Sequence, residues 1–312
     1  MMLSRVAERI YWSSRYIERV ECTVRMLSIY DNLLFDLPRN VVLSWYNLIK
    51  INSLEKDFAE RYTVQDERNV VKFMLGDDTN PSSVISSLHW LRENIRTTRD
   101  MMLEETWELT NELSIYVQEN LKKGINRSQR HEFLNEIIKG CLQIQGLLYS
   151  NMPTDAPWLF LKLGRYLERA DMTTRNLDAG VAAIMETKED EFAVNSRQII
   201  LGNVLRSLNA DQAYRRLTKA AVHSRDVMDF LVESPVLPRA LNHCLANMID
   251  SAEQLPCSEP LLQELYATRE QVLNNANYDR IDNQFRDYLN DVQLALNHLH
   301  LTISATWFPQ PE

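Results

Sequence analysis

Residues 12–27 read WSSRYIERVECTVRML, and residues 162–177 read KLGRYLERADMTTRNL. Seven of these sixteen aligned positions carry the same residue, whereas chance would give roughly one identity at ordinary residue usage. The identical pairs are Arg15/Arg165, Tyr16/Tyr166, Glu18/Glu168, Arg19/Arg169, Thr23/Thr173, Arg25/Arg175 and Leu27/Leu177. The offset of 150 residues is close to half of the 312-residue chain. We therefore predict an internal duplication of an R-Y-x-E-R helix, with pseudo-repeats over residues 1–150 and 151–312.

Apolar residues around both copies follow the period of a helix, and six of them predict a helix over about 3–34: Val6, Ile10, Ile17, Val20, Val24 and Leu27. Further helices are expected over about 40–60, 66–75, 81–121, 128–148, 158–186, 194–208, 211–232, 236–252, 259–274 and 280–304. Asn80 and Pro81 are expected to begin one of them, and Ser234 and Pro235 another. No segment alternates as a β-strand does. The expected fold is all-α, a single domain over residues 1–312 built as a multi-helix bundle around two long helices.

The composition limits the class of protein. Only 7 glycines occur, where average usage would give roughly 22, so Gly-rich turns and phosphate-binding loops are not expected. The formal net charge of −9 and the lack of a lysine-rich patch argue against nucleic acid as a partner. No run approaches the roughly 18 apolar residues of a membrane span, and no signal peptide follows Met1. We therefore expect a cytoplasmic protein that does not enter a membrane.

Few residues are arranged for metal binding or for a known catalytic motif. The four cysteines show no C-x-x-C spacing, and the six histidines form no H-E-x-x-H or E-x-x-H motif. The sequence also lacks G-x-S-x-G, G-x-x-x-x-G-K and G-x-G-x-x-G. No metal, cofactor or catalytic set is predicted. A desolvated Glu18 or Glu168 could serve as a general base, but an adjacent arginine would hold its pKa low.

The charged residues of the motif share one face of the first long helix. With Arg15 as the reference, Glu18, Arg19 and Arg25 fall in a stripe about 120° wide, opposite the apolar arc. Apolar residues interrupt this stripe in both copies, which suits a buried or partner-binding surface better than open water. Both copies use Arg and Glu rather than Lys and Asp, and the planar guanidinium is suited to bidentate pairing with a carboxylate or phosphate.

Three interpretations of the stripe remain open. It can be a solvated face, with helix-spaced ion pairs worth a few tenths of a kcal/mol each. It can be a buried network between the two helices, in which case Glu18 should lie close to Arg165 or Arg169. It can be a site for an anion, a substrate or a partner, and the candidate binding residues are then Arg15, Tyr16, Glu18, Arg19, Arg25, Arg165, Tyr166, Glu168, Arg169 and Arg175.

Other arginines lie outside the motif. Arg92, Arg96 and Arg99 fall at i, i+4 and i+7 of the expected 81–121 helix, which predicts a one-sided basic ridge and adds them to the candidate binding residues. The second half contributes further arginines: Arg215, Arg216, Arg225 and Arg239. These groups could hold phosphate or carboxylate, or they could simply neutralise the 43 acidic residues of the chain.

Five segments together resemble the bacterial alpha-E family: M-L-S-R-V-A-E-R-I-Y-W-x-x-R-Y-I-E-R, W-L-F-L-K-L-G-R-Y-L-E-R-A-D-M-T-x-R, R-E-N-x-R-x-x-R-D, D-Q-A-Y-R-R and S-P-V-L-P-R-A-L. The resemblance covers essentially the whole chain. It implies an all-helical fold with Glu18-Arg19 and Glu168-Arg169 as the signature positions. It also implies a setting, because such proteins are typically encoded beside, or fused to, circularly permuted ATP-grasp proteins, often with a transglutaminase-like protease.

Hypotheses from different classes follow. The first is an accessory or partner protein of an ATP-grasp amide ligase, without catalysis of its own, whose paired Glu-Arg helices form a docking, anion-binding or substrate-holding surface. The second is an enzyme acting on peptide or other amide bonds with a motif carboxylate as acid or base. That enzyme needs Glu18 or Glu168 in a cleft with a raised pKa. The third is a purely structural helical scaffold.

Overall fold

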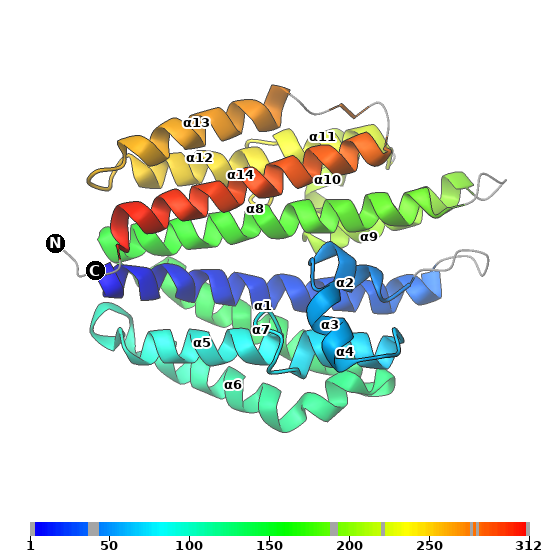
Figure 1. Ribbon diagram of the computed structural model, residues 1–312, viewed down its shortest axis with the longest axis horizontal. Coiled ribbons are helices and arrows are strands. Elements are labelled where there is room, and N and C mark those ends of the chain that lie inside the picture. The colour runs from blue at the N-terminus through cyan, green and yellow to red at the C-terminus, as the bar shows by residue number, and fades with distance from the viewer. Residues whose placement is uncertain are drawn as a thin grey trace.

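The computed structural model describes residues 4–36, 44–187, 193–219, 222–274, 277–278 and 281–309. Throughout these ranges the regular secondary structure is helical and no strand occurs, as the all-α class requires (Figure 1). The elements are α1 (Ser4–Asp36), α2 (Asn47–Ile51), α3 (Glu55–Arg61), α4 (Glu67–Gly76), α5 (Val84–Arg96), the 3-10 helix η1 (Arg99–Met101), α6 (Glu104–Ile125), α7 (Arg127–Asn151), α8 (Ala156–Met185), α9 (Ala193–Ser207), α10 (Asp211–Thr218), α11 (Ser224–Glu233), α12 (Leu241–Ala252), α13 (Glu259–Asn274) and α14 (Asn283–Trp307).

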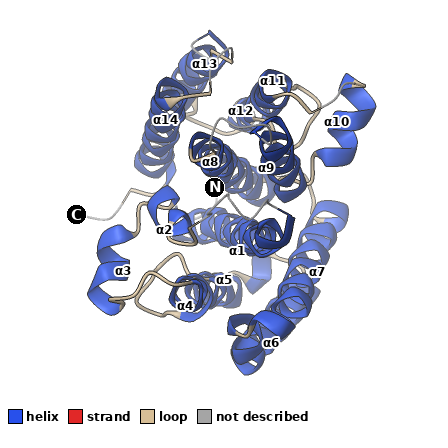
Figure 2. Cartoon of the chain, turned by 90° about the vertical axis from the view of Figure 1, so that its right-hand side faces the viewer, coloured by secondary structure: helices blue, strands red, loops and turns tan. Residues whose placement is uncertain are grey.

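Helices α1 and α8 form the centre of the molecule. They are 33 and 30 residues long, lie side by side and run in the same direction (Figure 1). The end-on view shows the other helices arranged around this pair (Figure 2). A Cβ atom on Gly164 of α8 would overlap the carbonyl oxygen of Tyr11 and the hydroxyl of Ser14 on α1. Glycine at this position therefore permits the close approach of the two helices.

The remaining helices pack on opposite sides of the central pair. Helices α4 to α7 lie on the side of α1, whereas α9 to α14 lie mainly on the side of α8 (Figures 1 and 2). Helix α14 runs antiparallel to α8, so its C-terminal half lies near the N-terminal half of α1. The predicted apolar arc of α1 supplies core residues, of which Ile10, Val20 and Val24 are fully buried. Their burial contributes to the hydrophobic stabilisation of the central helix pair.

Two expected helices are each divided. The structure describes residues 44–60 of the expected 40–60 helix, and this stretch contains α2 and most of α3, with a break between them. Ser53 adopts a left-handed conformation with φ of 56°, and the Asn52 side chain donates a hydrogen bond to the Leu48 carbonyl. This local side-chain bonding offers the backbone an alternative to continuing the helix. The resulting α2–α3 turn, residues 52–54, borders the candidate site.

The prediction of one continuous helix over residues 81–121 is also wrong, because this stretch is divided as well. Helix α5 ends at Arg96, and the Thr97 and Thr98 hydroxyls donate to the carbonyls of Glu93 and Asn94. These bonds satisfy the exposed end of the helix. The chain then forms η1 before α6 begins, so the helical spacing on which the arginine ridge depends stops at residue 96.

The beginning of α5 also differs from the prediction. Ser83 is the capping residue, since its side chain accepts a hydrogen bond from the Ser86 backbone at 3.1 Å. Asn80 instead stabilises the preceding turn, in which Pro81 lies, and donates to the Phe73 carbonyl at 3.1 Å. Asn80 and Pro81 therefore belong to a turn, and the helix begins three residues later than expected, at Val84.

The second half shows two similar differences. The expected 211–232 helix is replaced by α10 and α11, and α10 ends at Thr218, directly before Lys219, whose φ of 52° is left-handed. Residues 220–221 lie outside the described ranges. Ser234 accepts a hydrogen bond from the backbone of Leu237, but α12 begins only at Leu241.

Within the described ranges, none of the helices combines the length and the continuous apolar character that crossing a bilayer requires.

Candidate functional site

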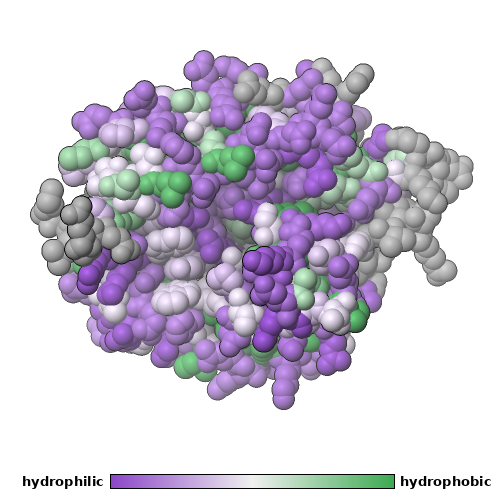
Figure 3. Space-filling view, in the orientation of Figure 1, coloured by the Kyte–Doolittle hydropathy of each residue, from purple (hydrophilic) through white to green (hydrophobic). Residues whose placement is uncertain are grey.

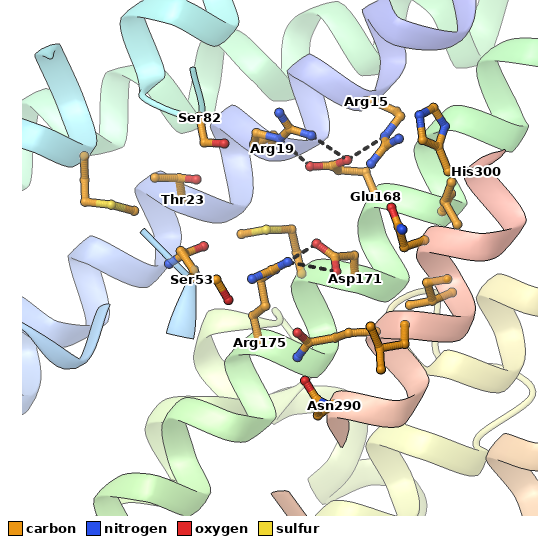
Figure 4. Close-up of a pocket in the computed structure, with 18 residues that line it drawn as sticks. Arg15, Arg19, Thr23, Ser53, Ser82, Glu168, Asp171, Arg175, Asn290 and His300 are labelled. Carbon is orange, nitrogen blue, oxygen red and sulfur yellow. Dashed lines mark hydrogen bonds and ion pairs between the residues drawn. The ribbon is translucent and has the colours of Figure 1, made fainter. Parts of the chain in front are cut away.

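The Glu-Arg motifs of α1 and α8 face each other across the centre of the molecule. Glu168 on α8 accepts a hydrogen bond from Arg15 Nε at 2.7 Å and from Arg19 Nη2 at 3.1 Å, and Arg19 Nε makes a further contact with the same carboxylate (Figure 4). Both arginines come from α1 and are one helical turn apart. A single carboxylate therefore binds two guanidinium groups of the neighbouring helix.

For the other glutamate the roles of the two helices are exchanged. Glu18 on α1 accepts from Arg169 Nε and Nη2 on α8, each at 2.8 Å, which is a bidentate pair. Arg239, from the turn before α12, adds a third bond at 2.9 Å. The expectation that Glu18 lies against Arg165 or Arg169 is thus confirmed for Arg169. Glu18 and Glu168 are 0% and 1% exposed, so the solvated-face interpretation is wrong.

The two copies are not equivalent in their bonding. Arg165 occupies the place in α8 that Arg15 occupies in α1, yet no carboxylate binds it within the described residues. Its guanidinium instead lies 5.6 Å from the centre of the Tyr149 ring, a cation–π contact. Arg239 is the second guanidinium that binds Glu18, and Thr173 holds its backbone by donating to the Arg239 carbonyl at 2.9 Å.

Further ion pairs extend this network along α1. Glu21 accepts from Arg25 at 2.7 Å, from Arg239 at 2.8 Å and from Gln145 on α7 at 2.9 Å. A local signal exists for Glu21, because it lies four residues before Arg25 on the same helix face. No such signal exists for Gln145 or Arg239, whose partners lie more than 100 residues away. We call the set Arg15, Glu18, Arg19, Glu21, Arg25, Glu168, Arg169 and Arg239 the Glu-Arg network.

The charges of the network determine the protonation of its carboxyl groups. Burial alone would raise the pKa of Glu168, but the charges of Arg19 and Arg15 outweigh it and lower the pKa to about 2. Burial and the opposing charges of Arg169 and Arg239 act in the same way on Glu18, whose pKa is also lowered to about 2. Both glutamates are therefore ionised at neutral pH.

A polar pocket opens beside Glu168, on the side of α1 and α8 that faces α14. Its cavity is about 340 Å³ (Figure 4). Its walls come from α1, α8, α14 and the α2–α3 turn, with one residue each from α4 and from the turn before α5: Arg15, Arg19, Thr23, Asn52, Ser53, Met74, Ser82, Leu167, Glu168, Asp171, Met172, Arg175, Asn290, Gln293, Leu294, Leu296, Asn297 and His300. In the space-filling view the surface is hollowed here and mainly hydrophilic (Figure 3).

The lining of the pocket carries a positive surplus. Three guanidinium groups face two carboxylates, because Arg175 joins Arg15 and Arg19 while Asp171 joins Glu168. Arg175 is held by Asp171 at 2.8 Å and by the Ile51 carbonyl at 2.8 Å. Such an arrangement favours a ligand with one negative charge and several hydrogen-bonding groups.

His300 adds a neutral polar group to the rim of the pocket. Burial, assisted by the nearby charge of Arg15, lowers the pKa of His300 to about 4. Its Nδ1 lies 3.0 Å from the Tyr11 hydroxyl, and the two rings are stacked. At neutral pH the imidazole is therefore uncharged and leaves the positive surplus to the arginines.

The remaining predicted site residues lie at different distances from this centre. Tyr16 is partly exposed and stacks on Trp12, whereas Tyr166 is buried and contacts His243 edge to face. The predicted Arg92, Arg96 and Arg99 ridge is wrong, because α5 ends at Arg96.

The three arginines of that expected ridge have separate partners. Arg92 donates to Asn111 at 2.8 Å, Arg96 pairs with Glu93 at 3.0 Å, and Arg99 lies 4.0 Å from the Trp107 ring centre. None of the three lines the pocket beside Glu168. Among the described residues, moreover, no group of three or more His, Cys, Asp or Glu side chains is placed to hold a metal ion.

Fold and site together define an all-helical domain whose two central helices are joined by reciprocal Glu-Arg pairs. The chain matches the Alpha-E family, described as a predicted alpha-helical domain with a conserved ER motif, over residues 2–308. It therefore belongs to the Alpha-E family.

Curated relatives and solved structures add little about activity. The chain is 21% identical over 274 residues to the uncharacterized protein Mb2597 of Mycobacterium bovis (strain ATCC BAA-935 / AF2122/97) and to the uncharacterized protein MT2643 of Mycobacterium tuberculosis (strain CDC 1551 / Oshkosh). Each match covers 81% of this chain and 30% of the relative, so the chain spans less than a third of the length of the curated relatives it matches. No solved structure matches the chain.

Proposed function

We propose that this chain is a binding subunit of an ATP-grasp amide ligase system, and that the polar pocket beside Glu168 holds the substrate or a segment of the partner. The observation that carries the proposal is the positively charged pocket of about 340 Å³, lined by Arg15, Arg19 and Arg175. Amide ligases act on carboxylates, and a carboxylate is the kind of group that fixed guanidinium groups recognise.

The Glu-Arg network supports this role by fixing the arginines of the pocket. Arg15 and Arg19 donate to Glu168 through some of their N–H groups, and the same side chains line the cavity. A guanidinium has five N–H donors, so each arginine keeps donors for a ligand. Because the carboxylate holds the side chains in place, little conformational entropy is lost when a ligand binds.

An enzyme that uses a motif carboxylate as acid or base is less well supported. Glu18 and Glu168 each bind two guanidinium groups, and the pKa of each carboxyl is lowered to about 2. A general acid must carry a proton near the working pH, and a general base is most effective with a pKa near that pH. Neither condition is met by these two side chains.

A scaffold role and an ancestral duplication fit the same geometry. The two central helices are parallel, and each supplies a glutamate to arginines of the other. We propose that α1 and α8 descend from one duplicated helix, and that Arg239 replaced Arg165 at Glu18 as the copies diverged. The network then contributes to the stability of the fold as well as to the pocket.

The partner is proposed from the family resemblance, with support from the curated relatives. The match covers only 30% of each mycobacterial relative, so most of each relative lies outside it. In those proteins a segment similar to this chain is therefore part of a longer polypeptide. That arrangement suits a module that works next to another protein. Transglutaminase-like proteases are a second proposed partner on the same grounds.

The test is complex formation with an ATP-grasp protein of the kind that the family resemblance implies, taken from the organism that encodes this chain. Both proteins are purified and run together on size exclusion and in a pull-down at micromolar concentration, with and without ATP and Mg²⁺. We expect a stable complex in at least one condition. If no complex forms in any of them, the partner role is refuted.

Matched variants locate the surface involved. Arg175→Gln removes one positive charge from the pocket, and Arg96→Gln removes one from the exposed end of α5. Thermal melts first confirm that both variants fold. We expect Arg175→Gln to weaken the complex or abolish its response to substrate, and Arg96→Gln to behave like the natural chain. If the two variants form the complex equally well, the docking surface lies outside the pocket.

A further inference from the structure

The polar pocket continues as a groove along α14. A second cavity of about 350 Å³ shares Ser53, Asn290 and Gln293 with the first, and extends it towards Asn283 at the beginning of α14. From His300 to Asn283 the helix advances by about 26 Å at 1.5 Å per residue. The groove is therefore longer than a compact metabolite needs.

Three asparagines are spaced regularly along this groove. Asn283, Asn290 and Asn297 are seven residues apart, so they lie on one face of α14 at intervals of about 10.5 Å. All three side chains are exposed, and none has a hydrogen-bond partner within the described residues. A carboxamide can donate and accept at the same time, which is what the backbone of a peptide requires from a binding surface.

The opposite wall offers matching groups. Thr23 of α1 is only 3% exposed, yet its side chain lines the pocket and has no hydrogen-bond partner among the described residues. Ser53 and Ser82 add hydroxyl groups on the same side (Figure 4). On the α14 wall itself, Leu294 is 61% exposed, lies between Asn290 and Asn297 and supplies an apolar contact.

The charges differ between the two ends of the groove. At the end near His300, Arg15 and Arg19 share the single carboxylate of Glu168, whereas Arg175 lies further along the groove, where it binds Asp171 and the Ile51 carbonyl (Figure 4). Towards Asn283, by contrast, the lining contains two cations, on Lys50 and Arg286, and two carboxylates, on Asp178 and Asp287. The groove is thus positive at one end and balanced at the other, which gives it a direction.

We propose that the groove binds an extended peptide-like chain of about seven or eight residues, with a carboxylate group at the Arg15–Arg19 end. An extended chain rises about 3.3 Å per residue, so three of its residues cover about 10 Å and match the interval between the asparagines. The asparagine amides bind the backbone, and the arginines select the negative end. This inference rests on the proposed function, because both place the ligand in the pocket beside Glu168.

The test uses the isolated chain labelled with ¹⁵N only in its asparagine residues. The probe is an octapeptide of alternating glycine and serine with a free C-terminal carboxylate, titrated at millimolar concentration and followed by NMR. We expect the side-chain NH₂ signals of Asn283, Asn290 and Asn297 to shift. The same peptide with an amidated C-terminus is expected to bind about fivefold to tenfold more weakly.

Variants on α14 provide the matched control. Asn290→Ala should weaken peptide binding about fivefold, whereas Gln284→Ala, an exposed amide of the same helix outside the groove, should leave it unchanged. Both positions are exposed, so neither change should unfold the protein.

Two results would overturn the inference. In the first, no asparagine signal responds to the peptide. In the second, acetate or inorganic phosphate produces the same shifts as the peptide, which would leave a pocket for a small anion only. Either result leaves the partner experiment untouched. If the chain binds the peptide but forms no complex with the ATP-grasp protein, the peptide-binding groove is supported and the proposed partner role is refuted.

Discussion

Replacing Glu168 with alanine separates the roles of the Glu-Arg network. The Glu168 side chain is 1% exposed and binds the guanidinium groups of Arg15 and Arg19, which are themselves only 11% and 18% exposed. Glu168→Ala removes the carboxylate and leaves two positive charges close together and largely out of water. Breaking a buried ion pair in this way is strongly destabilising, because the remaining charge has no compensation.

The magnitude can be worked out from the electrostatics. The pKa of Glu168 is lowered from 4.5 to about 2, and each pKa unit corresponds to about 1.4 kcal/mol, so the network favours the ionised carboxylate by about 3 kcal/mol. Loss of one partner from a buried pair typically costs about 3–5 kcal/mol. Because the pocket lets some water reach Arg15 and Arg19, we expect the lower value. At about 2 °C per kcal/mol, the melting temperature should fall by roughly 6 °C.

The assay is thermal and urea unfolding of Glu168→Ala, with two comparison variants. Glu18→Ala should be destabilised at least as much, because Glu18 is fully buried and lies away from the pocket. Glu112→Ala removes a carboxylate from the exposed surface of α6 and should change the free energy of unfolding by less than about 1 kcal/mol. If both motif variants unfold like Glu112→Ala, the network does not stabilise the fold and the reasoning is refuted.

Three further results are expected. The pKa values of Glu18 and Glu168 are lowered to about 2, so the stability that these carboxylates contribute is complete above about pH 4.5 and declines as the pH falls towards 2. Urea unfolding near pH 3.5 should therefore show a loss of about 1 kcal/mol per carboxyl relative to pH 6. A Glu168→Gln chain that loses just as much would contradict this. Gly164→Ala should unfold several degrees lower than the natural chain in thermal melts, because the added methyl group meets the Tyr11 carbonyl; an unchanged melting temperature would mean that the helices can move apart freely. A thiol reagent should modify Cys257 rapidly and the three buried cysteines only after denaturation, and rapid reaction of more than one thiol in the native protein would show that the core opens.

The sequence was sufficient for the fold class, and one of the three interpretations left open for the stripe named the central contact. Period and repeat together predicted two long helices, and the buried-network interpretation predicted that Glu18 lies close to Arg165 or Arg169. These predictions rest on local spacing, which is preserved when a helix forms. The identical residue types in both copies narrowed the chemistry to Arg–Glu pairing, and the structure contains that pairing between α1 and α8.

The breaks between helices and the distant partners could not be predicted. Thr97 and Thr98 end α5 by bonding to nearby carbonyls, but threonine within a helical pattern does not by itself indicate a break. Arg239 reaches Glu18 from 221 residues away, and no spacing rule connects positions so far apart. The pocket was missed for the same reason, since its asparagines on α14 meet the motif only after the chain has folded.

The reciprocal ion pairs also determine how α1 and α8 align lengthwise. Two long apolar helices can slip past each other by one turn, about 5.4 Å, because one aliphatic side chain can replace another in a packed layer with modest loss. Such a slip would leave Glu168 with only one of Arg15 and Arg19, which are one turn apart, and would break the bidentate pair of Glu18 with Arg169, so buried charges would lose partners. The network therefore disfavours the shifted registers, which matters for a chain whose central helices lie about 150 residues apart in the sequence.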